Sequence, residues 1–133
     1  MGIYLNPGNA SFRGSLRSKI YVDKSGLIAK TNDVICTEQK YVCVSRPRRF
    51  GKSMAANMLT AYYSRGCDSK EMFSKYKIAK ADSFEKHLNK YNVIHINKYA
   101  RIFKCNTRYR RNACYFTKKG NKGIKIEISR LCR

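Results

Sequence analysis

The sequence predicts an α/β fold in which a parallel sheet carries flanking helices. Residues 41–45 and 91–96 are apolar and rich in β-prone residues, as buried strands are. Between them, residues 53–63 place apolar side chains three and four positions apart, the spacing of a helix with one buried face. Strand, helix and strand in this order form a βαβ unit, so we expect the two strands to run parallel. The length of 133 residues fits one domain.

Local signals define the elements before and within the first strand. Residues 1–19 contain Pro, Gly, Asn and Ser, and they predict an irregular lead-in. Asp23 is a helix-capping residue type, so its carboxylate is expected to accept backbone N–H groups at the start of a helix over residues 24–31. Because the strand over residues 41–45 is almost wholly apolar, both of its faces are expected to be buried, with Cys43 a small core residue.

Further helices and a hairpin are predicted in the second half of the chain. D-x-x-E patterns begin at Asp68 and at Asp82, and each resembles the capping box that opens a short helix. Residues 113–117 and 124–128 are strand-like, and the Gly-Asn-Lys-Gly run between them is able to close a hairpin. Since an isolated hairpin is only marginally stable, residues 98–133 are expected to be the least protected part of the chain.

Positive charge is the most unusual property of the composition. Twenty-nine Lys+Arg against 8 Asp+Glu give a net charge of +21, which favours anionic partners such as nucleotides and nucleic acid. Residues 98–133 alone hold +11, interleaved with Tyr109, Tyr115 and Phe116, as in surfaces that bind single-stranded nucleic acid. Several interpretations of this basic tail stay open: a native extension, a nucleic-acid module, a disordered segment, or non-native sequence after a shift of reading frame.

Membrane and secreted proteins are disfavoured by the sequence. No apolar run approaches the roughly 20 residues that a membrane-spanning helix needs, so no membrane partner is expected. The N-terminus lacks the basic and apolar regions of a signal peptide. The six cysteines form no C-x-x-C pair and show no metal-ligand spacing, so they are expected to be reduced thiols. These features predict a cytoplasmic protein and leave its oligomeric state open.

The loop over residues 46–53, Arg-Pro-Arg-Arg-Phe-Gly-Lys-Ser, contains the predicted phosphate-binding residues. Its Gly-Lys-Ser end matches the second half of the phosphate-binding pattern G-x-x-x-x-G-K-[ST], while Arg46 stands at the position of the first glycine. A strand before the loop and a helix after it are the context that this pattern requires, because the N–H groups that open a helix form an anion site.

Each residue type in the loop has a physical role in this interpretation. Gly51 allows the backbone to approach a phosphate, the Lys52 ammonium reaches terminal phosphate oxygens, and the Ser53 hydroxyl completes the shell of a Mg²⁺ ion. The arginines add cations. The predicted nucleotide-binding residues are Arg48, Arg49, Phe50, Gly51, Lys52 and Ser53.

The run Ser-Arg-Pro-Arg-Arg-Phe-Gly-Lys-Ser-Met resembles the variant phosphate loop of the bacterial AAA-ATPase-like domain family, in which R-P-R-R-F-G-K-[ST] replaces the glycine-rich form. The Tyr-Val-Asp-Lys-Ser run from Tyr21 is similar to that family's lead-in, and the resemblance covers about residues 15–97. It implies a partial P-loop NTPase-type parallel sheet, truncated before the long ATPase body and nuclease-like domain common in the family. Residues 20–97 would be the N-terminal part of this domain, binding ATP with Mg²⁺ through Lys52 and Ser53.

ATP hydrolysis needs an acidic residue at the end of an apolar strand, and no clear candidate follows the loop. Four of the later acids stand at predicted helix starts, and Glu127 lies within a strand-like run. Asn97, which follows the second strand, is a poor substitute, so no catalytic residue is assigned. His87 and His95 have no partner at metal-ligand spacing. The alternative from a different class is a small basic nucleic-acid-binding protein without nucleotide chemistry.

Overall fold

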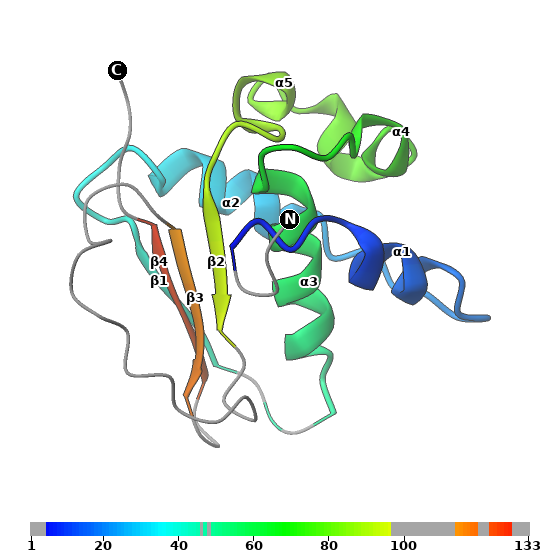
Figure 1. Cartoon of the computed structure of the whole chain (residues 1–133), viewed down its shortest axis with the longest axis horizontal. Coiled ribbons are helices and arrows are strands. Elements are labelled where there is room, and N and C mark those ends of the chain that lie inside the picture. Colours follow the sequence, from blue (N-terminus) through cyan, green and yellow to red (C-terminus); the bar gives the residue numbers. More distant parts are fainter. Residues whose placement is uncertain (1–4, 46, 48, 97–113, 120–122, 129–133) are drawn as a thin grey trace.

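The computed structural model describes residues 5–45, 47, 49–96, 114–119 and 123–128. Helices fill the first part of the chain, and the strands come together into one sheet (Figure 1). In chain order the elements are α1 (Ala10–Leu16), α2 (Gly26–Val34), β1 (Tyr41–Val44), α3 (Lys52–Tyr63), α4 (Lys70–Phe73), the 3₁₀ helix η1 (Lys77–Lys80), α5 (Phe84–His87), β2 (Val93–Ile96), β3 (Cys114–Lys119) and β4 (Gly123–Ile128).

The four strands lie in the order β1-β4-β3-β2. The β3–β4 pair is antiparallel and closes from Lys119 to Gly123, which confirms the predicted hairpin. Strand β4 also pairs antiparallel with β1, and β3 pairs parallel with β2. Strands β1, β2 and β3 therefore run in one direction, but the hairpin lies between the two strands of the predicted βαβ unit. A P-loop-type parallel sheet stays a prediction.

Helices α2 and α3 lie on one side of the sheet, and this explains the burial pattern of β1 (Figure 1). Val42 and Val44 pack against the core, whereas Tyr41 is 56% exposed and Cys43 is exposed. The prediction of a strand buried on both faces, with Cys43 in the core, is wrong. Alternate side chains of a strand point to opposite faces, and here the described helices cover only one of them.

Helix α3 is the centre of the core, and its position confirms the helix predicted over residues 53–63. Met58, Leu59, Tyr62 and Tyr63 are almost fully buried. The Tyr62 ring meets the Phe73 ring edge-on, with the ring centroids 5.5 Å apart. Burial of such large aromatic side chains contributes strongly to folding, so these contacts hold α3 firmly in the core.

The lead-in contains a helix that local composition did not reveal. Residues 10–16, predicted to be irregular, form α1, and Phe12 on this helix is completely buried. Its ring stacks on that of Phe73 at a centroid distance of 5.2 Å. Gly14 weakens the intrinsic helix propensity of the segment, but the burial of Phe12 stabilises the helix through tertiary contact.

Asp23 precedes α2, which begins two residues later than predicted; its N-cap is Ser25, so the prediction that Asp23 caps this helix is wrong. The Ser25 N–H donates to Asp23 Oδ1 at 2.8 Å, and the Lys77 N–H donates to Oδ2 at 3.3 Å. The short helices predicted from the D-x-x-E patterns are present as α4 and α5, and the Lys70 N–H donates to Asp68 Oδ1 at 3.0 Å. Among the described residues, no helix has both the length and the apolar character needed to cross a bilayer.

Candidate phosphate-binding site

The candidate site is the loop between β1 and α3, at the edge of the sheet where β1 ends (Figure 1). In open α/β sheets, ligands bind outside the carboxyl ends of the strands, and this loop has that location. Its described residues are Pro47, Arg49, Phe50 and Gly51, followed by the first turn of α3. The predicted site residue Arg48, like Arg46, lies outside the described residues.

Gly51 is the N-cap of α3 and has a left-handed backbone with a φ of +73°. Its carbonyl accepts the Ala55 N–H at 3.0 Å, which is the first bond of the helix. Arg49 is also left-handed, with a φ of +67°. The loop therefore turns sharply before the helix, and the Gly-Lys-Ser sequence stands at the helix start. The first N–H groups of any α-helix have no acceptor within the helix, which makes this position suitable for an anion.

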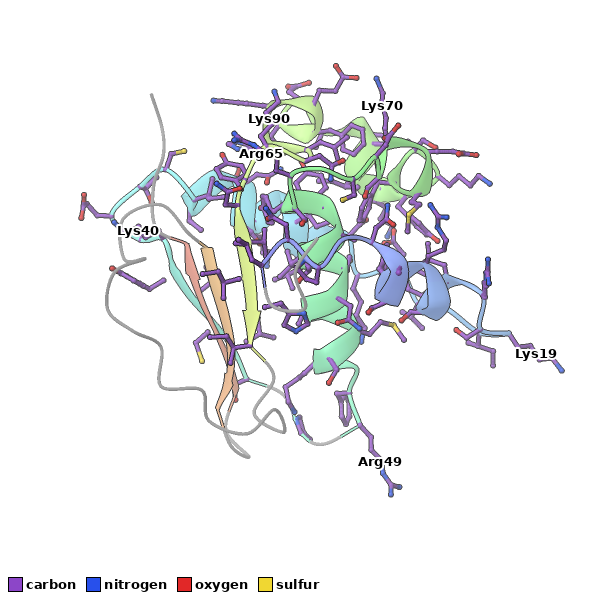
Figure 2. All side chains as sticks on the ribbon, in the orientation of Figure 1. Lys19, Lys40, Arg49, Arg65, Lys70 and Lys90 are labelled. Atoms are coloured by element: carbon purple, nitrogen blue, oxygen red, sulfur yellow. The ribbon has the colours of Figure 1, made fainter. Side chains whose placement is uncertain are left out.

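Lys52 and Ser53 occupy the first turn of α3, as the sequence predicts. The Lys52 ammonium folds back over the loop and donates to the Pro47 carbonyl at 2.7 Å. Ser53 is exposed, and the Phe50 side chain is 62% exposed. Figure 2 shows Arg49 pointing outward from the loop. The described site residues thus surround an accessible helix start.

Lys24 contacts the loop, although the sequence did not identify it as a site residue. Its ammonium donates to the Phe50 carbonyl at 2.8 Å, across a sequence separation of 26 residues. A side-chain carbon built on Gly51 would overlap Lys24 Nζ. Lys24 is part of the Tyr-Val-Asp-Lys-Ser run that resembles the family lead-in, but no spacing rule connects that run with the loop.

Comparison with known families agrees with the variant loop. A family model described as "Predicted AAA-ATPase" matches residues 10–129. The chain belongs to the predicted AAA-ATPase family. The matched region includes α1 and the β3–β4 hairpin, so it extends on both sides of residues 15–97, where the sequence resemblance lies. Neither the curated proteins nor the solved structures contain a match to the chain.

Asp23 is the carboxylate next to Lys24 in the sequence. Burial acts to raise its pKa, but hydrogen bonds from Ser25 and from the Lys77 N–H outweigh burial, and the pKa of Asp23 is lower than its usual value. The ionised carboxylate is therefore a structural group that joins the start of α2 to η1.

The strand ends beside the loop carry no acidic residue among those that the structure describes. Strands β1, β3 and β2 end at Val44, Lys119 and Ile96. Glu127 pairs with Tyr41, at the opposite end of β1 from the loop. Tyr41 and Val44 are three positions apart, so Glu127 lies roughly 10 Å along the strand from the loop edge. Asn97 lies outside the described residues.

Of the two histidines, His87 is buried and His95 is half-buried. His87 Nδ1 and the Tyr91 hydroxyl are 2.6 Å apart. Burial, together with the charges of Lys86 and Lys90, lowers the pKa of His87, and burial alone lowers that of His95. The described residues contain no group of three or more metal-binding side chains. Cys43 and Cys67 are free thiols.

Proposed function

We propose that this protein binds ATP with Mg²⁺ through the loop over residues 46–53. The observation that carries the proposal is the left-handed Gly51 cap, which sets the Gly-Lys-Ser sequence at the start of a 12-residue helix. Family membership supports nucleotide chemistry independently of that geometry. The helix start supplies oriented N–H groups and the positive end of a dipole, and both stabilise a bound phosphate.

Lys52 is the proposed ligand of the terminal phosphates. In the structure its ammonium donates to the Pro47 carbonyl. A phosphate oxygen is a stronger acceptor than a neutral carbonyl because the hydrogen bond becomes charge-assisted on both sides. Binding would therefore exchange the carbonyl for phosphate, with the ammonium still close to the loop. Arg48, Arg49 and Phe50 complete the proposed nucleotide-binding set.

The described residues fit a magnesium ion that arrives with the nucleotide. Ser53 provides one hydroxyl oxygen at the start of α3. Magnesium in nucleotide sites takes few protein ligands, because phosphate oxygens and water fill most of its octahedral shell. Bound there, Mg²⁺ would neutralise phosphate charge, while Ser53 would hold its position relative to Lys52.

Replacement of Lys52 tests the proposed binding directly. We expect Lys52→Ala to abolish detectable Mg-ATP binding in calorimetry, because it removes the cation placed at the terminal phosphates. Lys30→Ala is the matched control: Lys30 is an exposed lysine on α2, and its loss removes the same charge elsewhere. Equal ATP binding by folded wild type and Lys52→Ala would refute the phosphate-loop assignment.

Nucleic-acid binding is the alternative that the same preparation can test. The net charge of +21 favours it, yet Lys19, Lys40, Arg49 and Lys90 project from different sides of the molecule (Figure 2). Binding through several backbone phosphates weakens by orders of magnitude between low and moderate salt. We expect Mg-ATP binding to respond less to salt than to the Lys52 charge. Tight, salt-sensitive binding of single-stranded DNA that Lys52→Ala leaves unchanged would favour the alternative.

We also propose that the protein works in the cytoplasm. The free thiols of Cys43 and Cys67 fit a reducing compartment, where thiols stay unpaired. Labelling of these cysteines with a thiol reagent in intact cells, before any exposure to air, tests the assignment, and protection by disulfides would contradict it.

A further inference from the structure

We propose that Lys24 is a positioning residue of the phosphate loop. Its ammonium holds the peptide between Phe50 and Gly51 in the orientation that turns the Gly51 N–H toward the bound phosphate. The functional part of this inference rests on the proposed ATP binding, whereas the holding of the loop is a property of the nucleotide-free protein. Lys24 lies outside the loop motif, in the segment that precedes α2.

The backbone around Lys24 is anchored on both sides. The residue before it, Asp23, accepts the N–H groups of Ser25 and Lys77. The residue after it, Ser25, is 1% exposed, and its hydroxyl accepts the Ile78 N–H at 3.3 Å. A long lysine side chain loses considerable rotamer entropy when it is fixed, so its contact is most effective when it extends from a rigid backbone. Lys24 meets that condition.

The contact with Phe50 fixes the direction of a peptide plane. Lys24 Nζ donates to the Phe50 carbonyl at 2.8 Å. Because the peptide is planar and trans, its N–H group points opposite to its carbonyl. The Gly51 N–H is therefore directed away from Lys24. Successive N–H groups in a turn of this kind line anion-binding concavities.

Gly51 leaves the space that Lys24 uses. Its φ of +73° is a conformation that favours glycine, and a side-chain carbon at this position would overlap Lys24 Nζ. The ammonium thus occupies the place beside Gly51 where any other residue would have its side chain. Because Gly51 has no side chain, there is room for the Lys24 ammonium, and the backbone is also able to adopt the left-handed turn.

Lys24 and Lys52 act on different carbonyls and have different roles. Lys52 donates to Pro47 and, in the proposed function, leaves it for phosphate. Lys24 donates to Phe50, one residue before the helix cap, and this bond is compatible with a phosphate at the helix start. The loop therefore keeps a fixed peptide orientation while Lys52 changes its partner. Lys24 lowers the reorganisation that binding requires, which is how a preformed site gains affinity.

The test uses full-length Lys24→Met, Lys24→Arg and the control Lys30→Met, each measured by hydrogen exchange and by Mg-ATP calorimetry. In nucleotide-free protein, we expect Lys24→Met to raise amide exchange in residues 49–53 about tenfold, the size expected for loss of a hydrogen bond to a charged group. Exchange in the buried half of α3 reports whether each variant is folded. We expect a similar, about tenfold, loss of ATP affinity. Lys24→Arg should keep loop exchange and ATP affinity close to their wild-type values, because a guanidinium also donates to a carbonyl. Lys30→Met should change neither quantity.

The outcomes separate the positioning role from the proposed function. Unchanged loop exchange in folded Lys24→Met overturns the inference whether or not ATP binds. Faster exchange with unchanged ATP affinity also overturns it, since the loop orientation would then not matter for binding. If wild type binds no ATP, the proposed function fails, and the exchange measurement with its rescue by Lys24→Arg still decides whether Lys24 holds the loop.

Discussion

Gly51 ends the loop, caps α3 and faces the Lys24 ammonium. The sequence pattern predicts one role for Gly51, which is to allow the backbone to approach a phosphate closely. The structure adds a left-handed φ and the space for a lysine from another element. Gly14, in contrast, has neither a left-handed backbone nor an atom within 4 Å of a side chain built on it. These two glycines therefore allow a matched comparison.

We expect Gly51→Ala to destabilise the fold by about 1–2 kcal/mol, the usual cost of a left-handed non-glycine residue. Gly14→Ala should instead stabilise it by about 0.5–1 kcal/mol, since alanine is the better helix former. Urea denaturation measures both changes. Because the new side chain would also displace Lys24, Gly51→Ala and Lys24→Met should combine less than additively. Strict additivity would mean that the Lys24 contact survives in Gly51→Ala.

Histidine burial predicts a loss of stability at mildly acidic pH. The pKa values of His87 and His95 lie below the ordinary value of 6.5 when the chain is folded. As the pH falls below 6.5, the unfolded chain takes up these protons first and becomes favoured. Unfolding free energy should therefore be constant above this pH and decrease below it, until the folded-state pKa values are reached. Protonation of Asp23 affects the unfolding free energy only at lower pH, because the ordinary pKa of this carboxyl is 3.8.

Urea titrations at pH 7.5 and pH 5.5 measure this dependence. The His87→Gln, His95→Gln double variant should reduce the difference between the two pH values, because glutamine does not titrate. A wild type that is equally stable at both pH values would contradict the lowered pKa values of His87 and His95.

At the residue scale, the sequence predicts a site residue well when its signal is local. Lys52 and Ser53 follow directly from the Gly-Lys-Ser pattern, and the structure has both at the helix start. Lys24 could not be found in this way, because its contact with Phe50 joins segments 26 residues apart. The residue types at two distant positions do not predict that a lysine side chain will contact a particular backbone carbonyl. Arg48 lies outside the described residues, so its role stays a prediction.

At the scale of elements, apolar periodicity predicts α3 closely, but it does not say how many faces of a strand are covered. The run from Tyr41 to Val44 looks buried throughout, yet Tyr41 and Cys43 are exposed. Which face receives a helix depends on connections between elements and not on the strand's own residues. Helix α1 shows the converse: Phe12 stabilises it through contact with Phe73, about 60 residues away in sequence.

The strand register leads to a prediction about turnover. Val44 stands at the loop edge, and Glu127 is roughly 10 Å away along β1. A carboxylate that helps to hold Mg²⁺ or to activate water must lie beside the phosphates. We therefore expect purified protein to hydrolyse ATP more slowly than about 0.1 per second, well below the typical range of enzymes. A phosphate-release assay measures this rate.

A faster rate would contradict this assignment of the strand ends. Two variants would then locate the activity. Glu127→Gln tests the acid within β4, and Lys52→Ala tests whether the rate belongs to the loop or to a contaminating ATPase.

At the scale of the whole molecule, the position of the β3–β4 hairpin determines which residues belong to the domain. The composition of residues 98–133 predicts a basic tail, native or not, outside a domain that ends near Asn97. The structure puts β4 and β3 between β1 and β2, so the two strands of the predicted βαβ unit have no direct pairing. Composition and charge carry no information on pairing order, and a hairpin far along the chain is able to insert between earlier strands.

Hydrogen exchange of the full chain therefore tests the extent of the domain. Strand β4 pairs with a neighbour on each side, so its amides should be protected to a degree similar to that of α3. This expectation reverses the low protection that composition alone predicts for the region. The measurement needs moderate salt, because a net charge of +21 opposes the compact state and salt screens that repulsion.

A proline within β4 provides the matching mutational test. Ile126 pairs with Val42 on one side and with Phe116 on the other. Proline removes a backbone donor and is poorly tolerated in a central strand, so Ile126→Pro should lower the thermal midpoint of the whole domain and accelerate exchange in β1. The edge position of β1 makes this coupling specific, since β4 is the neighbour that joins it to the sheet. Exchange of residues 114–128 at the rate of an unfolded peptide, with an unchanged thermal transition in Ile126→Pro, would place the end of the domain near Asn97.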